Sequence, residues 1–187
     1  MSIVNMSKPY HHGELRNALI AAGTAALEET GNADISLRET ARRAGVSPTA
    51  TYRHFASKET LLATIAGNGF VDLGQRFAEA EDGLAGFGRA YIGFARDRPA
   101  MFQLMFGGAY SIGTLSEGEQ KVGHNAYGVL IDAVAKHAEL PPDDPKVLRR
   151  AVRVWSLVHG YAMLLLDDRL PDAAQSDAFL TEMLSQN

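Results

Sequence analysis

The sequence contains no cysteine. Disulfides, thiolate zinc sites, cysteine nucleophiles and thiol redox sensing are therefore excluded, and the stability of the fold must come from packing. Long apolar runs are also absent. The longest one, from Val154 to Leu166, contains Ser156, His159 and Gly160, and it falls short of the roughly 18–20 residues that span a bilayer. The first residues lack the apolar core of a signal peptide. These absences predict a cytoplasmic protein.

Positive charge is also scarce. The 187 residues include 22 acidic and 18 basic side chains, and the net charge of −4 argues at first sight against a nucleic-acid-binding protein. The charge is unevenly distributed, however: residues 1–66 hold seven basic and six acidic side chains, whereas residues 67–187 hold eleven and sixteen. The acidity therefore belongs to the C-terminal two-thirds and leaves a nucleic-acid partner open for the first third.

The spacing of apolar residues predicts helices along the chain. Leu15, Leu19, Ala22 and Ala26 lie on one helical face. No segment alternates apolar and polar residues as a half-buried strand does, and no strand-flanked hairpin turn is found. With 46% hydrophobic residues the chain can bury a core. The predicted fold class is all-α.

Serine residues mark the expected starts of several helices. Ser36 precedes Glu39 by three residues, which is the spacing of a reciprocal capping box. Ser47 is followed by a proline at the first helical position. Ser57 is expected to cap a long fourth helix that continues to about residue 80, although glycines weaken its middle. Further helices are expected at about residues 84–97, 99–106, 117–138, 144–168 and 174–185.

Residues 36–55, SLRETARRAGVSPTATYRHF, contain two short helical patterns separated by a turn. Ala41 is small enough for the helices to cross closely, Gly45 supplies the turn, and Val46 fills the corner between them. This arrangement predicts a helix-turn-helix, whose second helix enters the major groove of DNA. Short helical hairpins with a glycine turn also occur without a DNA partner, so the pattern alone leaves both interpretations open.

If the second short helix enters the groove, its first residues Pro48, Thr49 and Ala50 face the base edges. Thr49 can exchange hydrogen bonds with bases, and the Ala50 methyl group suits contact with a thymine methyl group. Side chains along the flanks of this helix are placed for phosphates. The predicted DNA-contacting residues outside the base-facing three are Ser47, Tyr52, Arg53, His54 and Lys58.

Two neighbouring groups allow alternative interpretations. Arg42 and Arg43 belong either to the exposed surface of the first short helix, which is favoured, or to the DNA contacts. The leader Tyr10-His11-His12-Gly13 lacks the His-x₃-His spacing and the carboxylate pair of a metal site. No metal is therefore predicted, and the leader is expected to contact the DNA backbone.

Several motifs follow a long first helix that ends at Gly31, namely Ser36-Leu37-Arg38, Ala44-Gly45-Val46-Ser47, Tyr52-Arg53-His54-Phe55 and Ser57-Lys58-Glu59-Thr60-Leu61-Leu62. In this order and spacing, residues 15–66 resemble the N-terminal DNA-binding domain of TetR-type transcriptional regulators. The resemblance implies that Arg38 and residues 48–50 face bases, that Tyr52, His54 and Lys58 hold phosphates, and that Val46 and Phe55 lie in the core. It also implies a DNA-binding domain at residues 1–62 and a ligand-binding and dimerisation domain at residues 63–187.

Trp155, His159 and Gly160, together with the Tyr-His-His-Gly leader, resemble the tryptophan-histidine-glycine signature of one C-terminal subfamily of these regulators. The four-residue spacing places Trp155 and His159 on one face of a helix. His159 is either a polar group on the floor of an apolar pocket or a hydrogen-bonded core histidine, and the sequence leaves both open.

Regulators of this type read palindromic sites as dimers. The helix expected at 144–168 is apolar nearly all round in its second half, so it must be buried on several sides. With the last segment it is predicted to form a four-helix interface across a two-fold axis. The alternative is that these residues belong to the core of one subunit. The predicted interface residues are Val152, Ala162, Met163, Leu166, Phe179 and Met183.

Aromatic residues and methionines recur between residues 70 and 106, where they form either a ligand pocket or plain core. Methionines can repack around varied ligands, and an apolar or aromatic ligand with one hydrogen-bonding group is expected. The candidate wall also includes Phe77, Met101 and Phe106. The predicted ligand-contacting residues are Phe70, Tyr91, Phe94, Phe102, Met105, Trp155 and His159.

No His-Glu-x-x-His, Gly-x-Ser-x-Gly or phosphate-binding loop occurs in the sequence. We therefore predict no enzymatic activity and no cofactor. The sequence predicts a ligand-responsive dimeric repressor, released from its operator when the fourth helix is displaced, with bending near Gly67, Gly69 and Gly74. The alternative is an all-helical interaction module, or a regulator that acts through a protein partner without a small-molecule ligand.

Overall fold

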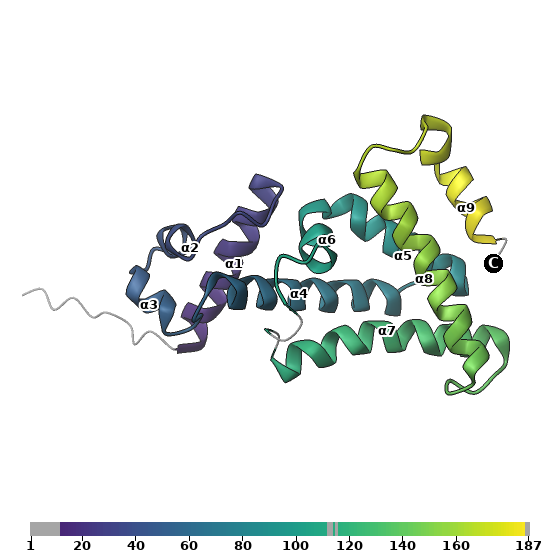
Figure 1. The fold of residues 1–187 in the computed structure, drawn as a ribbon, viewed down its shortest axis with the longest axis horizontal. Coiled ribbons are helices and arrows are strands. Elements are labelled where there is room, and N and C mark those ends of the chain that lie inside the picture. Colours follow the sequence, from purple (N-terminus) through teal and green to yellow (C-terminus); the bar gives the residue numbers. More distant parts are fainter. Residues whose placement is uncertain (1–11, 112–113, 115, 186–187) are drawn as a thin grey trace, which may run out of the picture.

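The computed structural model describes residues 12–111, 114 and 116–185, and the regular structure of these residues is entirely helical (Figure 1). The predicted all-α fold is confirmed. The elements in chain order are α1 (His12–Thr30), α2 (Leu37–Arg43), α3 (Pro48–Tyr52), α4 (Lys58–Ala78), α5 (Gly83–Asp97), α6 (Pro99–Phe106), α7 (Glu117–Ala138), α8 (Pro145–Leu166), the 3₁₀ helix η2 (Asp172–Gln175) and α9 (Asp177–Ser185).

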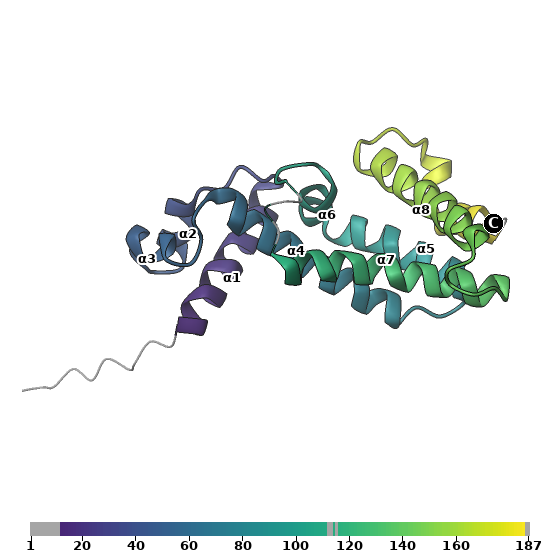
Figure 2. The same cartoon turned by 60° about the horizontal axis from the view of Figure 1, so that its bottom comes forward.

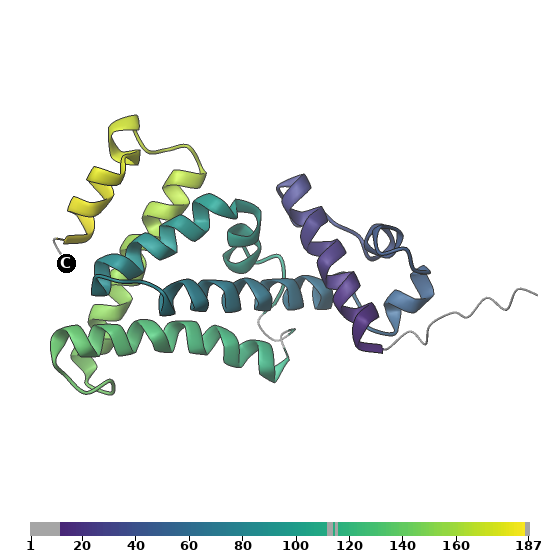
Figure 3. The same ribbon diagram turned by 180° about the vertical axis from the view of Figure 1, so that it is seen from behind.

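The helices are arranged along the length of α4. Helices α1, α2 and α3 gather at one end of the molecule, and α4 leads from them into the remaining helices (Figure 1). Helix α7 runs beside α4, and α8 crosses the far half of the molecule next to α5 (Figure 2). Seen from behind, α9 lies at the end opposite to α3 (Figure 3). Helix α4 therefore belongs to the packing of both ends.

Serine caps fix the starts of three successive helices. The side-chain oxygens of Ser36, Ser47 and Ser57 accept hydrogen bonds from the third backbone N–H of α2, α3 and α4, at 3.1, 3.2 and 3.2 Å. The predicted reciprocal box at Ser36 is wrong, because the carboxylate of Glu39 binds arginines of its own helix instead. The reciprocal box forms at Ser57, whose backbone N–H donates to the Thr60 hydroxyl at 2.9 Å.

Helix α4 continues without a break past Gly67 and Gly69, both of which are buried. A Cβ atom at Gly69 would lie 2.6 Å from the sulfur of Met105 and 2.8 Å from that of Met101. Both methionines belong to α6, so the glycine allows α6 to approach the backbone of α4 closely. Tertiary packing against α6 thus accounts for a glycine in the middle of α4, although glycine weakens an isolated helix.

Arg98, at the corner between α5 and α6, connects the two ends of the molecule. Its guanidinium group donates to Glu28 of α1 at 3.1 Å and to Asp72 of α4 at 2.7 Å. Arg76 extends this network by pairing with Asp97 at 2.7 Å. The first turn of α6 is therefore held against both α1 and α4.

The last predicted helix, residues 174–185, is two elements. Ser176 adopts an extended backbone (φ −73°, ψ 148°), which separates η2 from α9. The Tyr161 hydroxyl on α8 donates to the Ala174 carbonyl at 2.8 Å and holds η2 in place. None of the described helices is long and apolar enough to cross a membrane.

Candidate functional site

The turn between α2 and α3 has the geometry of a helix-turn-helix. Gly45 adopts a positive φ of 68°, a backbone conformation that glycine adopts without strain. The Val46 backbone N–H then donates to the Ala41 carbonyl at 2.9 Å and closes the turn. Thr51 points into the core, where its hydroxyl has no partner among the described residues. The opposite side of α3 is therefore left facing outward.

The predicted base-facing residues lie on this outward side. Pro48 and Thr49 are exposed and Ala50 is partly exposed, while Tyr52 is 60% exposed. The predicted core residue Phe55 is buried beneath them and stacks against the guanidinium group of Arg16, whose carbon lies 5.3 Å from the ring centre. The residues proposed to read bases thus form no part of the packing that holds α3.

The basic side chains near α3 differ in how far their charges are compensated. Arg38 and Arg53 are exposed. Lys58 pairs with the highly exposed Asp34 at 3.3 Å, and exposed pairs of this kind are weak. His54 is partly buried, and Ser47 is exposed beside the start of α3. These residues surround α3 on the same end of the molecule.

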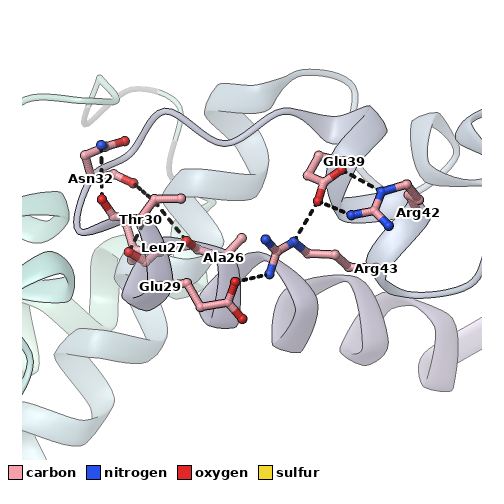
Figure 4. A network of polar contacts seen from close by, with 8 residues as sticks. All are labelled: Ala26, Leu27, Glu29, Thr30, Asn32, Glu39, Arg42 and Arg43. Carbon is pink, nitrogen blue, oxygen red and sulfur yellow. Dashed lines mark hydrogen bonds and ion pairs between the residues drawn. The ribbon is translucent and has the colours of Figure 1, made fainter.

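Arg42 and Arg43 form a separate ion-pair network with Glu29 and Glu39 (Figure 4). Arg42 binds both carboxylate oxygens of Glu39, at 2.6 and 2.8 Å. Arg43 donates to Glu39 at 2.9 Å and to Glu29 of α1 at 2.6 Å. Hydrogen bonds from the two guanidinium groups lower the pKa of Glu39 to about 2. The charges of both arginines are thus compensated within α1 and α2, as expected for exposed helix surface.

A cavity of about 550 Å³ lies among α4, α5, α6, α7 and α8. Four of the predicted ligand-contacting residues are on its wall: Phe70, Tyr91, Met105 and Trp155. The described wall residues include eight aromatic side chains and no charged one. The full described wall consists of Phe70, Leu73, Phe77, Phe87, Gly88, Tyr91, Met105, Phe106, Gly108, Tyr110, Ala126, Tyr127, Leu130, Val154, Trp155 and Val158.

Phe94, Phe102 and His159 are not among these wall residues. Phe94 is completely buried and its ring lies 5.2 Å from the Arg76 guanidinium carbon. Phe102 is also completely buried and supports the wall from behind, with its ring 4.9 Å from that of Phe106. Sequence reasoning missed Tyr127, since nothing in the pattern of α7 indicated that this helix closes the cavity. Phe87 was missed although it lies four residues before Tyr91 on α5, and that spacing could have identified it.

Tyr91, Trp155 and His159 form a polar cluster beside the cavity. The Tyr91 hydroxyl oxygen lies 2.8 Å from His159 Nδ1, and the indole N–H of Trp155 donates to the same oxygen at 3.3 Å. Burial raises the pKa of Tyr91 and lowers the pKa of His159. His159 is therefore a hydrogen-bonded imidazole whose surroundings favour its neutral form, and Tyr91 is the member of the pair that lies on the wall.

Apolar side chains are exposed on α8 and α9. Leu148 and Val152 lie on one face of α8 with exposures of 52% and 46%, and Phe179 on α9 is 41% exposed. Met163, Leu166 and Met183 are partly buried. Ala162 is completely buried in the core of its own subunit, so its assignment to a dimer surface is wrong.

Metal-ligating side chains do not cluster in the part of the chain that the structure describes: no group of three or more His, Asp or Glu there could hold an ion. Tyr10 and His11, half of the leader considered for metal and DNA contacts, lie outside the described residues.

Solved structures similar to this chain share its fold over nearly the whole length. A protein of unknown function from Rhodococcus sp. RHA1 is 31% identical, with 96% of each chain covered and a TM-score of 0.77. A tetR-family transcriptional regulator from Streptomyces coelicolor is 21% identical over 95% of this chain and 81% of its own, with a TM-score of 0.71. A TetR transcriptional regulator from Rhodococcus sp. RHA1 is 21% identical over 94% and 97%, with a TM-score of 0.66.

Family models match both ends of the chain. Residues 19–65 match the model for bacterial regulatory proteins of the tetR family, and residues 84–186 match the tetracyclin repressor-like C-terminal domain. No curated protein gives a significant match. The two models together cover most of the sequence, including the helix-turn-helix and the helices from α5 to α9. The chain therefore belongs to the TetR family of bacterial transcriptional regulators.

Proposed function

We propose that the protein is a dimeric repressor that binds a palindromic operator and is released from it by a small apolar or aromatic molecule. The observation that carries this proposal is the aromatic cavity of about 550 Å³. Helix α4, which begins beside α3, forms part of the wall of this cavity. A ligand in that cavity touches the helix that supports the DNA-reading unit. We place the boundary between the DNA-binding and ligand-binding domains at residues 62 and 63, within α4.

In the proposed complex, Arg38 and residues 48–50 contact bases. The phosphate contacts come from the residues that surround α3: Ser47, Tyr52, Arg53, His54 and Lys58. Because residues 1–66 carry only one more basic than acidic side chain, non-specific affinity for DNA is modest. Occupancy then depends on two subunits that engage two half-sites, about one helical turn or its multiple apart.

Dimerisation is proposed to use the exposed apolar faces of α8 and α9. Val152 and Phe179 are its exposed members, and Leu148 lies four residues before Val152 on the same helical face. Met163, Leu166 and Met183 complete the face as partly buried residues. Apolar side chains exposed at these fractions on neighbouring helices favour association through a self-complementary surface.

Ligand response is proposed to pass through α6. Met105 and Phe106 of α6 lie on the cavity wall, and the sulfur atoms of Met101 and Met105 pack on Gly69 of α4. A ligand that displaces α6 also displaces α4, and with it the position of α3. The ligand must bind the displaced state more tightly than the DNA-bound state, since only differential affinity shifts the equilibrium.

The DNA-binding part is tested by comparing three variants on duplexes recovered from a random pool. Thr49→Ala is expected to change the preference at one base position by about 1–3 kcal/mol. Tyr52→Ala and Lys58→Ala are expected to weaken binding to all sequences alike, and Lys58→Ala to reduce the salt dependence. An unchanged base preference in Thr49→Ala would show that α3 is placed wrongly on the DNA.

The alternative function, a helical module that acts through a protein partner without a small molecule, is tested in the same assay. Fluorescence anisotropy of a labelled operator duplex is expected to show steeply salt-dependent binding and release of the protein by an aromatic ligand. Operator binding that no cavity ligand weakens would favour the alternative.

A further inference from the structure

Starting from the ligand pocket of the proposed function, we propose that its ligand donates a hydrogen bond to the hydroxyl oxygen of Tyr91, as a phenol or another aromatic hydroxyl compound does. An aromatic molecule that can only accept a hydrogen bond is then the poorer ligand. Tyr91 is thus the residue that selects the ligand, and His159 orients the hydroxyl group of Tyr91.

The direction of one hydrogen bond at Tyr91 is fixed by chemistry. The indole nitrogen of Trp155 can only donate, so the Tyr91 oxygen accepts at this contact, which is 3.3 Å long. A tyrosine hydroxyl has one hydrogen and two lone pairs. After the contact with Trp155, the hydrogen and one lone pair remain available.

The contact with His159 takes the hydrogen. The Tyr91 oxygen and His159 Nδ1 lie 2.8 Å apart, a length that fits a bond donated by the hydroxyl group, and the direction follows from the donors that must be satisfied. The reverse direction would leave the Tyr91 hydrogen without a partner in an aromatic wall, and buried donors without a partner are rarer than underused acceptors. Burial also lowers the pKa of His159, which favours the neutral ring, and Nδ1 accepts in the tautomer that carries its hydrogen on Nε2.

One lone pair of the Tyr91 oxygen therefore remains for the ligand. Two other hydroxyl groups are on the described wall. Tyr110 donates to the Met105 carbonyl at 3.3 Å, so its hydrogen is engaged near the C-terminal end of α6. Tyr127 packs its ring on Trp155, with the ring centres 5.6 Å apart. It provides the matched control, because its hydroxyl group is on the same wall but does not belong to the polar cluster of Tyr91, Trp155 and His159.

The experiment uses the full-length protein and three probes that share a tert-butylphenyl group: para-tert-butylphenol, para-tert-butylanisole and tert-butylbenzene. Trp155 is the single tryptophan of the chain and lies on the cavity wall, so its fluorescence reports binding. The phenol is expected to bind about 3- to 10-fold more tightly than the anisole, which is the usual effect of one hydrogen bond. In Tyr91→Phe this ratio is expected to fall to about 2-fold or less, and in Tyr127→Phe it is expected to persist.

A second variant keeps the test independent of how well Tyr91→Phe folds. In His159→Leu the Tyr91 hydrogen is released to donate, so binding of the anisole is expected to improve relative to the phenol. Equal or tighter binding of the anisole to the unmodified protein would overturn the assignment while the pocket itself stands. Absence of fluorescence change with all three probes would instead overturn the pocket, and with it the proposed ligand response.

Discussion

Helices α2 and α3 expose the side chains proposed to act, whereas α5 and α6 bury theirs. Tyr52 is 60% exposed and lies beside Thr49, which is also exposed. Tyr91 is only 3% exposed and is held by partners from another helix. The side chains at the α3 end thus lie on the outside of the packed helices, whereas those at the other end line a cavity inside the core.

Because of this contrast in burial, the two ends respond to mutation in different ways. A surface residue of α3 can be exchanged without loss of packing, so its removal reports on DNA contact alone. A cavity residue takes part in the core, and its removal changes both ligand affinity and the free energy of unfolding. Four predictions test this contrast, beginning with the largest expected effect.

The strongest test is removal of a ring behind the cavity wall. Phe102→Ala is expected to lower the free energy of unfolding by about 3–5 kcal/mol, because a completely buried ring leaves a void when removed. Urea unfolding followed by circular dichroism measures the loss. Val71→Ala, at a side chain 42% exposed on α4, is the control and should change stability by less than about 1 kcal/mol. A similar value for both variants would mean that the cavity end is not packed as a core.

The second test compares two glycines of α4. Gly69→Ala is expected to destabilise by about 1 kcal/mol, since its Cβ would displace the sulfur atoms of Met101 and Met105. Gly74→Ala meets nothing within 4 Å and is expected to stabilise by about 0.5–1 kcal/mol through helix propensity. Thermal unfolding distinguishes the two signs. Gly69→Ala should also blunt ligand response, and an unchanged response would contradict coupling through the contact of α6 with α4.

The third test separates the cap of α3 from its DNA contacts. Ser47→Ala is expected to lower stability by about 1 kcal/mol, because the Ala50 N–H loses its side-chain acceptor. Ser47→Asp retains a good capping group and should preserve stability, yet its negative charge at the DNA surface should weaken operator binding. Denaturation and anisotropy are measured on both variants. Full operator affinity in Ser47→Asp would remove Ser47 from the proposed phosphate contacts.

The smallest effects are those of pH on the free energy of unfolding. The two ends of the molecule are expected to lose stability in different ranges of pH. The pKa of His159 is lowered by burial, so the folded state disfavours protonation. Stability from this group is complete above the ordinary histidine pKa and is lost as pH falls below about 6.5. Glu39 has its pKa lowered to about 2, so its contribution is present above its ordinary pKa of 4.5 and is lost as pH falls toward 2.

Denaturation at a series of pH values measures both effects. His159→Phe should flatten the step below pH 6.5, and Glu39→Gln the step between pH 4.5 and 2. If His159→Phe leaves the first step unchanged, the neutral state assigned to His159 is wrong.

Local features of the chain were predictable from sequence because their causes are local. The serine caps at positions 36, 47 and 57 and the positive φ of Gly45 depend on residues within a few positions. The exposed surface favoured for Arg42 and Arg43 agrees with their ion pairs. The partner of Glu39 was mistaken, because a carboxylate three and four residues before two arginines prefers them to a backbone N–H.

Features that depend on how helices face one another were not predictable. The second half of α8 is apolar nearly all round, and the sequence cannot say which side meets its own core; Ala162 was placed on the wrong side for this reason. Phe94 and Phe102 share the helical spacing of Tyr91 and Met105, but both are completely buried and neither is among the described wall residues. The role of Tyr127 in closing the cavity depends on the position of α7 beside α4, which no local pattern encodes.

Helix α3 has a consequence for how such a regulator can diversify. Of its five residues only Thr51 is buried, and its start is set by Ser47 outside the helix. Anchorage and recognition are therefore assigned to different positions of one short segment. If residues 48–50 read bases as proposed, exchanging them changes the operator sequence while the packing of the other helices stays as it is.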